Sequence, residues 1–403
     1  MRVAILAYTF PRGMGYIGNM LPRYLARLGA EVHYITMDLP HYFQSTDRIN
    51  SYGTFSGLDV MDPGAVESYG GFTLHGLGHR ASLGQMKYVG LEEKLRSLRI
   101  DVVQSLVAIG WPALQAASAR RKLGFSLFTA NHTTASVFPL AQRPSSALSP
   151  ARVKNFLTRY APGRFISRES VKCYAATVDC ARVAVDFFGV EPDKIALAPL
   201  GVDTDLFWPI RSDAERADRN ALRAELGVSE GEVLFVYSGQ FTVAKNPLLL
   251  ADAIQQMAGL GLPVRALLIG DGAQAAYIAT RRNAIVRPFM ANAMLPRYYR
   301  AADVGVWPTQ ESTSMLDAAA CGLPIVVNDT LRAVERIQGN GLQYRLNDLG
   351  DLVRVLTTLL DARRRDELGS LGARRMEREF SWRDLAARRL SDYETSLHTA
   401  RPS

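Results

Sequence analysis

The sequence predicts an α/β protein of two domains, each built on a parallel sheet. The chain has 403 residues with 48% hydrophobic content, which exceeds what one core normally supports, so two domains of roughly 200 residues each are expected. Apolar strand patterns at 3–8 (VAILAY) and 233–239 (VLFVYSG) are each followed by a turn and a helical pattern. Strands that alternate with helices form parallel sheets, and ligands bind beyond the carboxyl ends of such strands. We therefore expect two similar Rossmann-like halves.

The segment 307–328, WPTQESTSMLDAAACGLPIVVN, has the pattern of a strand end, a polar turn, a helix and a second strand. Backbone N–H groups at the start of a helix, together with the helix dipole, form a site for anions. The residues of this turn are Ser312, Thr313, Ser314 and Met315. Asp317, on the first turns of the helix, can accept hydrogen bonds from ribose or sugar hydroxyls. Phosphate and hydroxyl recognition together are what a nucleotide-linked substrate needs, although this segment alone is also compatible with a structural helix.

A second segment, 233–254, supplies a cation. Its strand pattern ends at Gly239, and Lys245 precedes an amphipathic helix. A lysine is a sufficient point charge for phosphate. A lone lysine after a strand is usually only solvated, so its functional interpretation depends on the neighbouring motif.

These two segments resemble the signature of the family-4 retaining glycosyltransferases of the GT-B fold, whose members have two acidic residues eight positions apart before a small-residue helix. Asp317 in LDAAACGLP matches the second acid, whereas Thr309 stands at the position of the first and Glu311 is the nearest carboxylate. Gln240 occupies the position where the family usually has an arginine, five residues before Lys245. The bidentate guanidinium is therefore missing.

Other segments extend the resemblance over nearly the whole chain. Residues 198–209 (APLGVDTDLFWP) resemble the connection between the two domains, and 267–272 (LLIGDG) resembles the glycine turn beside the nucleotide. FSWRDLAARRL resembles the start of the last helix. The resemblance implies an acceptor-side domain over 1–200, a nucleotide-sugar domain over 201–380, and a C-terminal helix over 381–403 that returns to the N-terminal domain.

The resemblance implies transfer of a sugar from a nucleoside diphosphate sugar, with UDP or GDP as the expected nucleotide, to a glycan, lipid-linked or small-molecule hydroxyl. It implies retention at the anomeric carbon, no metal and no cofactor. Lys245 and the turn amides would stabilise the departing diphosphate. The expected catalytic residues are His132, Lys245 and Glu311, and the expected donor-binding residues are Gly15, Gly239, Gln240, Lys245, Gly270, Thr309, Ser312, Thr313, Ser314, Met315 and Asp317.

His132 follows the strand pattern FSLFTAN and corresponds to a histidine that many family members place near the reacting sugar. A histidine at a strand end is often only structural. Both interpretations stay open at this point.

Two other function classes are compatible with parts of the chain. Gly13, Gly15 and Gly18 form a G-x-G-x-x-G, and Asp38 follows 20 residues after Gly18, as in an NAD-linked oxidoreductase. Residues 10–12 lengthen the turn before the first glycine, and a loose glycine loop also resembles the glycosyltransferase N-terminal domain. The departures at Thr309 and Gln240 motivate a third class, an inactive GT-B subunit that only binds nucleotide sugar.

The net charge of +8 indicates an anionic partner. The stretch 143–172 has one acid, Glu169, against seven cations: Arg143, Arg152, Lys154, Arg159, Arg164, Arg168 and Lys172. Apolar residues at helical spacing within it, Val153, Phe156, Leu157 and Tyr160, are typical of a basic amphipathic surface that meets anionic membrane. A solvated helix face is the favoured interpretation. No nucleic-acid motif accompanies the charge.

Three cysteines, Cys173, Cys180 and Cys321, have no metal-ligand spacing and are expected to be buried in a reducing compartment. The apolar residues near the N-terminus fit a first strand better than a signal peptide, because Pro11 and Arg12 follow them without a cleavage site. No apolar run approaches the ~18 residues of a membrane span. The expected location is the cytoplasm, with any membrane contact peripheral to its inner face.

Overall fold

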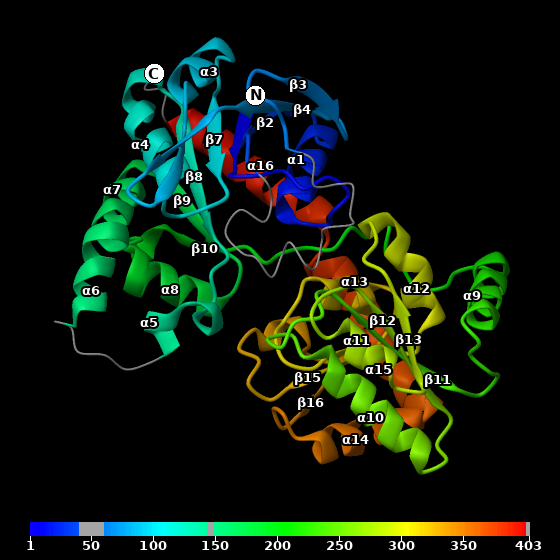
Figure 1. Ribbon diagram of the computed structural model, residues 1–403. Coiled ribbons are helices and arrows are strands. Elements are labelled where there is room, and N and C mark those ends of the chain that lie inside the picture. Colours follow the sequence, from blue (N-terminus) through cyan, green and yellow to red (C-terminus); the bar gives the residue numbers. More distant parts are fainter. Residues whose placement is uncertain (40–59, 143–148, 400–403) are drawn as a thin grey trace.

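The computed structural model describes residues 1–39, 60–142 and 149–399, and in it two parallel sheets divide the chain (Figure 1). The first sheet has eight strands in the order β10-β9-β8-β7-β1-β2-β4-β3. All neighbours in it pair parallel except β3, which is antiparallel to β4. Its strands are β1 (Arg2–Leu6), β2 (Glu31–Met37), β3 (Val66–Tyr69), β4 (Phe72–Leu77), β7 (Val102–Ser105), β8 (Ser126–Asn131), β9 (Lys172–Ala175) and β10 (Ile195–Leu197).

Helices cover both faces of this sheet, and a small hairpin of β5 (His79–Ser82) and β6 (Gln85–Tyr88) lies beside it. A π-helical turn, Phe156–Tyr160, joins two of the helices. The helices are α1 (Ile17–Arg27), α3 (Leu91–Ser97), α4 (Trp111–Leu123), α5 (Pro139–Gln142), α6 (Pro150–Asn155), α7 (Ala161–Glu169) and α8 (Val178–Phe188).

The second sheet has six parallel strands in the order β13-β12-β11-β14-β15-β16. These are β11 (Val233–Ser238), β12 (Val264–Ile269), β13 (Ala284–Arg287), β14 (Val304–Trp307), β15 (Ile325–Asn328) and β16 (Gly341–Tyr344). From Asp213 onward, the helices are α9 (Asp213–Glu225), α10 (Pro247–Gly259), α11 (Ala275–Ala279), α12 (Leu295–Ala301), α13 (Ser314–Ala320), α14 (Leu349–Thr357), α15 (Ala362–Glu379) and α16 (Trp382–Thr399).

In this second sheet the order of strands reverses between β11 and β14. The chain proceeds from β11 to β12 on one side and later returns to β14 on the other. The loops that leave the carboxyl ends of these two strands therefore diverge and open a crevice. The first sheet has the same arrangement at β1, which lies between β2 and β7.

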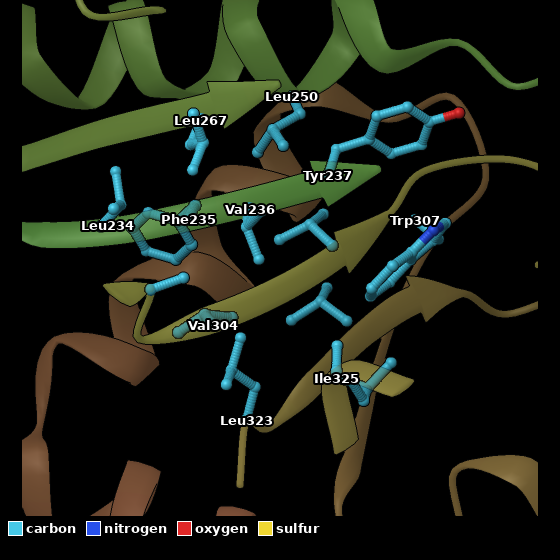
Figure 2. Close-up of a cluster of buried hydrophobic side chains, with 14 of the residues drawn as sticks. Leu234, Phe235, Val236, Tyr237, Leu250, Leu267, Val304, Trp307, Leu323 and Ile325 are labelled. Atoms are coloured by element: carbon cyan, nitrogen blue, oxygen red, sulfur yellow. The ribbon is translucent and has the colours of Figure 1, made fainter. Parts of the chain in front are cut away.

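The core of the C-terminal domain surrounds β11, and Figure 2 shows side chains of this strand packed among those of its neighbours. All six residues of β11 are buried, because helices cover both faces of the sheet. This explains why the strand is a continuous apolar run rather than an alternating one. Trp307, at the end of β14, is 1% exposed and lies at the edge of this core where the loops begin.

Two segments that cross between the domains pair with each other. Val202 N–H donates to Phe380 O at 2.8 Å, and Trp382 N–H donates to Val202 O at 3.0 Å. The chain then continues into α16, whose Trp382 and Tyr393 belong to the core of the N-terminal domain. Tyr393 OH donates to Gln104 on β7 at 2.8 Å. The last helix thus lies on the N-terminal sheet.

Several expectations from the sequence are confirmed. The first apolar stretch forms β1, and the segment 307–328 forms β14, a turn, α13 and β15 as predicted. The three cysteines are free and buried. Across the described ranges we find no helix with the length and apolarity that a membrane crossing requires. Arg143, counted in the basic stretch, lies outside the described residues.

We predict that Gly201→Ala destabilises the protein, because the paired connections leave no space for a side chain. A Cβ at Gly201 would lie 2.7 Å from Phe380 O and 2.8 Å from Leu385 Cδ1. Overpacking of this kind costs about 1–3 kcal/mol, and urea unfolding would measure it. Gly259→Ala is the matched control, since nothing lies within 4 Å of a Cβ there. Equal stability of the two variants would contradict the close approach.

Candidate functional site

A cavity of about 740 Å³ lies between the carboxyl edges of the two sheets, a size typical of small-molecule sites. The N-terminal domain contributes Met14, Gly15, Tyr16, Ile17, Val107, His132 and Val137. The C-terminal domain contributes Tyr237, Ser238, Gly239, Gln240, Lys245, Ile269, Phe289, Met290, Asn292, Leu295, Gln310, Ser312, Thr313, Ser314 and Asp317. No group of three His, Cys, Asp or Glu placed to hold a metal exists among the residues that the structure describes.

Nine of the predicted site residues therefore line one cavity, and four do not. The nine are Gly15, His132, Gly239, Gln240, Lys245, Ser312, Thr313, Ser314 and Asp317. Gly270, Thr309, Glu311 and Met315 lie behind its wall.

Gly270 shapes the cavity from behind. Its φ is +153°, and a Cβ on it would lie 1.9 Å from the carbonyl oxygen of Gly239, whose own φ is +150°. Only glycine permits both this backbone conformation and this approach. The two glycines bring the ends of β11 and β12 together, which leaves room beside Gln240.

Lys245 is held across the crevice. Its ammonium group donates to the carbonyl oxygen of Glu311 at 2.9 Å. This bond ties the head of the Lys245 side chain to the loop that follows β14. Within the described part of the cavity wall, Lys245 is the sole Lys or Arg. Among the described residues that line the cavity, no arginine supplies the guanidinium that the family usually has at the position of Gln240.

Trp307 joins the two loops of the C-terminal domain that follow β11 and β14 at the cavity. Its indole N–H lies 3.2 Å from the carbonyl oxygen of Ser238 and 3.1 Å from Ser314 Oγ. Ser314 Oγ also donates to Ser238 O at 3.2 Å. The end of β11 and the start of α13 are thereby fixed relative to each other.

The turn before α13 differs from the prediction that its amides face outward. Ser312 N–H contacts Met315 Sδ at 3.4 Å, Ser314 N–H contacts Ser312 Oγ at 3.4 Å, and Met315 N–H contacts Ser312 O at 3.3 Å. The turn closes on itself because a serine hydroxyl and a thioether lie within reach of its own amides. The two contacts to oxygen, at 3.4 and 3.3 Å, are longer than usual N–H···O hydrogen bonds and therefore weak. Met315 itself is buried and supports the turn from inside.

Asp317 lies on the inner side of α13 and lines the cavity. Burial raises the pKa of its carboxyl well above the usual value, and the nearby Asp203 raises it further. No hydrogen bond to the Asp317 carboxylate is found from any residue of the described chain. The carboxyl can therefore accept hydrogen bonds from a ligand. Its ionised form is unfavourable here because the site is buried.

Glu311 and Thr309, the two candidates for the missing first acid, do not reach the cavity. Glu311 Oε2 pairs with Arg336 at 3.3 Å, and the Arg336 side chain is only 7% exposed. Thr309 Oγ1 is buried without a hydrogen-bond partner in the described chain. Glu311 therefore does not line the cavity, because its carboxylate pairs with the buried guanidinium of Arg336, and its catalytic role stays a prediction.

His132 follows β8 and faces the cavity from the N-terminal domain. Burial lowers its pKa to about 3, and the charges of Arg389 and Arg336 act in the same direction. Both ring nitrogens are buried and bond to no described residue. Asn131, the last residue of β8, donates to Cys180 O at 2.8 Å and fixes the strand end. His132 thus lines the cavity as a neutral imidazole whose two unpartnered nitrogens are buried at the wall.

The N-terminal glycine loop closes against the C-terminal domain. Asn292 N–H donates to Gly13 O at 2.9 Å, and a Cβ on Gly15 would lie 2.6 Å from Asn292 Nδ2. A second contact across the domains joins Arg332 to Asp179 at 3.1 Å. Asp38, the acid of the dinucleotide pattern, pairs with His79 at 2.5 Å. The glycine loop therefore contacts the C-terminal domain. In a dinucleotide site, the same space would be open for pyrophosphate.

Sequence reasoning missed the residues that follow β13, Phe289, Met290, Asn292 and Leu295. No motif marks them. Their only signal is position, because they begin at the carboxyl end of a strand in a parallel sheet.

Two family models match the chain. The model described as Glycosyltransferase Family 4 matches residues 13–206, and the model described as Glycosyl transferases group 1 matches residues 232–362. A D-inositol 3-phosphate glycosyltransferase of Xylanimonas cellulosilytica is 30% identical over 97% of this chain and 96% of its own length. One of Geodermatophilus obscurus is 34% identical over 53% of this chain and 50% of its own length.

Solved structures share the architecture at low sequence identity. Sucrose-phosphate synthase from Thermosynechococcus elongatus superposes with a TM-score of 0.71 at 17% identity, covering 99% of this chain and 100% of that one. Anabaena Alr3699/HepE in complex with UDP has a TM-score of 0.69 at 15% identity, covering 98% and 100%. These likenesses show the GT-B fold.

These matches argue against an NAD-linked oxidoreductase, because that alternative explains only the glycine loop at Gly13–Gly18. Identity to a curated relative over nearly the full length, family matches in both halves and the GT-B architecture agree with one another. The chain belongs to the family-4 glycosyltransferases of the GT-B fold.

Proposed function

We propose that this chain transfers a sugar from a nucleoside diphosphate sugar to a hydroxyl acceptor, with retention of anomeric configuration and without a metal ion or cofactor. The observation that carries the proposal is the single cavity in which Lys245, the turn 312–314 and Asp317 meet His132. A lysine and backbone amides can bind a diphosphate, and a carboxyl can accept hydrogen bonds from ribose hydroxyls. Anabaena Alr3699/HepE is known in complex with UDP and with UDP-glucose, and UDP or GDP is the proposed nucleotide here.

The diphosphate lies between Lys245 and the turn 312–314 in this proposal. Departure of the diphosphate builds negative charge on its oxygens, and preorganised donors stabilise charge that develops in the transition state. The weak internal contacts of the turn, at 3.3–3.4 Å, are readily exchanged for phosphate oxygens. The apolar side chains of Phe289, Met290 and Leu295 provide the wall for the base.

His132 supports the transferred sugar as a neutral hydrogen-bonding group. With a pKa of about 3 it has no charge near neutral pH, so it can donate from one nitrogen and accept at the other. A protonated imidazole would instead compete with Lys245 for the diphosphate. The acceptor hydroxyl attacks on the face that the diphosphate leaves, which gives retention.

The acceptor binds in a second cavity, of about 880 Å³, in the N-terminal domain. Val137 lines both cavities, so the two adjoin. The wall of the second cavity includes Lys154 and Arg159 and, among the described residues, no acid. An acceptor with an anionic group fits this charge, as does the phosphate in the names of the curated relatives.

A binding protein without transferase activity is the second candidate. Gln240 in place of the usual arginine and the withdrawal of Glu311 onto Arg336 favour it. Hydrolysis of a nucleoside diphosphate sugar by the purified protein separates the candidates. Slow release of free nucleotide supports the enzyme, whereas binding without release from any donor supports the binding protein.

We predict that Lys245→Ala weakens nucleoside diphosphate binding by about 1.5–3 kcal/mol, the usual contribution of a charged hydrogen bond. Binding of the free nucleoside should hardly change, because the partner of Lys245 is phosphate. Isothermal titration with both ligands measures the difference. Equal loss for both ligands would sink the assignment.

For Asp317 we predict that binding of a ribonucleotide releases a proton. Ribose hydroxyls donate to the ionised carboxylate and so lower the pKa that burial has raised. Affinity for the ribonucleotide should therefore rise with pH between the pKa of Asp317 in the ligand-bound protein and its pKa in the free protein. Titration calorimetry in buffers of different ionisation enthalpy detects the released proton. Asp317→Asn should abolish this release and reduce discrimination between ribo- and deoxyribonucleotide, and unchanged discrimination would refute the role.

The same substitution has a predicted effect on stability. Burial gives the Asp317 carboxyl a higher pKa in the folded protein than in the unfolded chain. Below the unfolded pKa the carboxyl is protonated in both states and costs no stability, whereas stability is lost as pH rises from the unfolded pKa through the folded pKa. Asp317→Asn should therefore melt at a higher temperature than the native protein at neutral pH, with a difference that shrinks near pH ~4. A lower melting temperature at neutral pH would contradict the desolvated carboxyl.

Glu311 is predicted to act by positioning Lys245 through its carbonyl group, with its carboxylate held by Arg336. Both Glu311→Gln and Arg336→Gln should then reduce donor hydrolysis to a similar extent, and Thr309→Ala should matter less. If Glu311 instead reaches the sugar in the transition state, Glu311→Gln should lower kcat alone while Arg336→Gln keeps most activity. Thermal unfolding of each variant controls for loss of fold.

A further inference from the structure

The helical segment from α6 to α7 contains an extra residue that reorganises its outer face. The π-helical turn Phe156–Tyr160 separates the two α-helices. In an uninterrupted α-helix, Val153 and Phe165 would lie about 120° apart around the axis, at about 100° per residue. A π turn takes up one additional residue and brings Phe165 to within about 20° of Val153. The insertion thus aligns apolar residues that a regular helix would separate.

The aligned residues are exposed. Val153 is 45% exposed, Phe156 53%, Leu157 64% and Phe165 42%. The opposite side of the segment is fixed against the domain, because a Cβ on Gly163 would lie 1.8 Å from Phe188 O on α8, and Ile166 is buried. Figure 1 shows α6 and α7 on the flank of the N-terminal domain that faces away from the C-terminal domain. A contiguous exposed apolar group of this kind is typical of an interaction site.

Cations surround this apolar group. From Pro150 to Arg168 the segment contains no Asp or Glu. Lys154 and Arg168 are exposed, and neither side chain has an ion-pair or hydrogen-bond partner among the described residues. Arg164 is already paired with Glu191 at 3.2 Å, so it contributes less. Apolar side chains flanked by unpaired cations match the boundary of a bilayer that contains anionic lipid.

We propose that the outer face of α6, the π turn and α7, which we call the flank surface and define by Val153, Lys154, Phe156, Leu157, Phe165 and Arg168, docks on an anionic lipid bilayer. The apolar side chains enter the interface while the cations meet lipid headgroups. This goes beyond the transfer reaction and does not depend on it. The same segment lines the second cavity with Lys154, Thr158 and Arg159. A bilayer on the flank surface therefore lies beside the cavity assigned to the acceptor.

Cosedimentation of the full chain with vesicles tests the proposal. Vesicles of phosphatidylcholine alone are compared with vesicles that also contain phosphatidylglycerol. We expect binding only to the anionic vesicles, weakened by salt. Phe156→Ser with Leu157→Ser should reduce partitioning on the order of tenfold or more, because two large apolar side chains lose their burial. Lys154→Glu with Arg168→Glu should reduce it on the order of fivefold for each cation removed.

Matched controls come from α15 in the C-terminal domain. Leu371 is 48% exposed there, and Arg364 is exposed. Leu371→Ser and Arg364→Glu make the same chemical changes away from the flank surface and should leave vesicle binding unchanged. Phe156 and Leu157 line neither cavity, so their double variant should keep the donor hydrolysis rate of the native protein in the absence of vesicles. This readout separates loss of docking from loss of fold or of the proposed activity.

Three results would overturn the proposal. The first is absence of binding to anionic vesicles by the native chain. The second is binding that the flank variants and the α15 controls reduce equally, which would indicate attraction by net charge alone. The third is binding of duplex DNA by the flank surface with no preference for vesicles, which would assign the surface to another class of partner.

Discussion

The indole N–H of Trp307 holds the donor side of the cleft together. It lies between the last carbonyl group of β11 and the hydroxyl of Ser314 at the start of α13, at 3.2 and 3.1 Å. The two loops leave strands that are neighbours in the sheet but distant in the chain, so no local turn fixes their relative position. A buried tryptophan does so because its ring packs in the core while its single donor reaches the sheet edge. The positions of Lys245 and Asp317 in the cavity depend on this junction.

The second constraint is the connection between the domains. The crossing segments at Val202 and Ser381 pair with each other, and Gly201 permits their approach. The last helix returns to the N-terminal sheet, so any change in the angle between the domains is concentrated at this paired connection. Asn292 with Gly13, and Arg332 with Asp179, then bridge the domains near the cavity. A cleft that is joined by this connection and bridged near the cavity suits the closure around a donor that we propose, which would exclude water.

The sequence was sufficient for the sheets, for the loops after β11 and β14, and for nine of the residues that line the cavity. Those features depend on apolar periodicity, on glycines with positive φ such as Gly239, and on short motifs, all of which are local. What it did not predict depends on contacts between distant segments. The withdrawal of Glu311 requires Arg336 to be buried beside it, and the closure of the turn amides requires the Met315 thioether to fold back. The wall after β13 has no motif, and the π turn is not encoded by any periodicity in the residues around Phe156.

The cavity differs from the family pattern in its charge. One lysine replaces a lysine and an arginine, and the position of the first acid is a threonine whose hydroxyl is buried. If a nucleoside diphosphate binds here as we propose, the turn amides have a larger share in holding it than they would beside two cations.

The most direct test is a crystal structure of the protein soaked with UDP and, separately, GDP. The account predicts the diphosphate within hydrogen-bond distance of Lys245 Nζ, the ribose hydroxyls on Asp317, and the turn amides released from Ser312 Oγ and Met315 Sδ onto phosphate oxygens. A diphosphate bound instead at the Gly13–Gly18 loop, away from Lys245 Nζ, would contradict it.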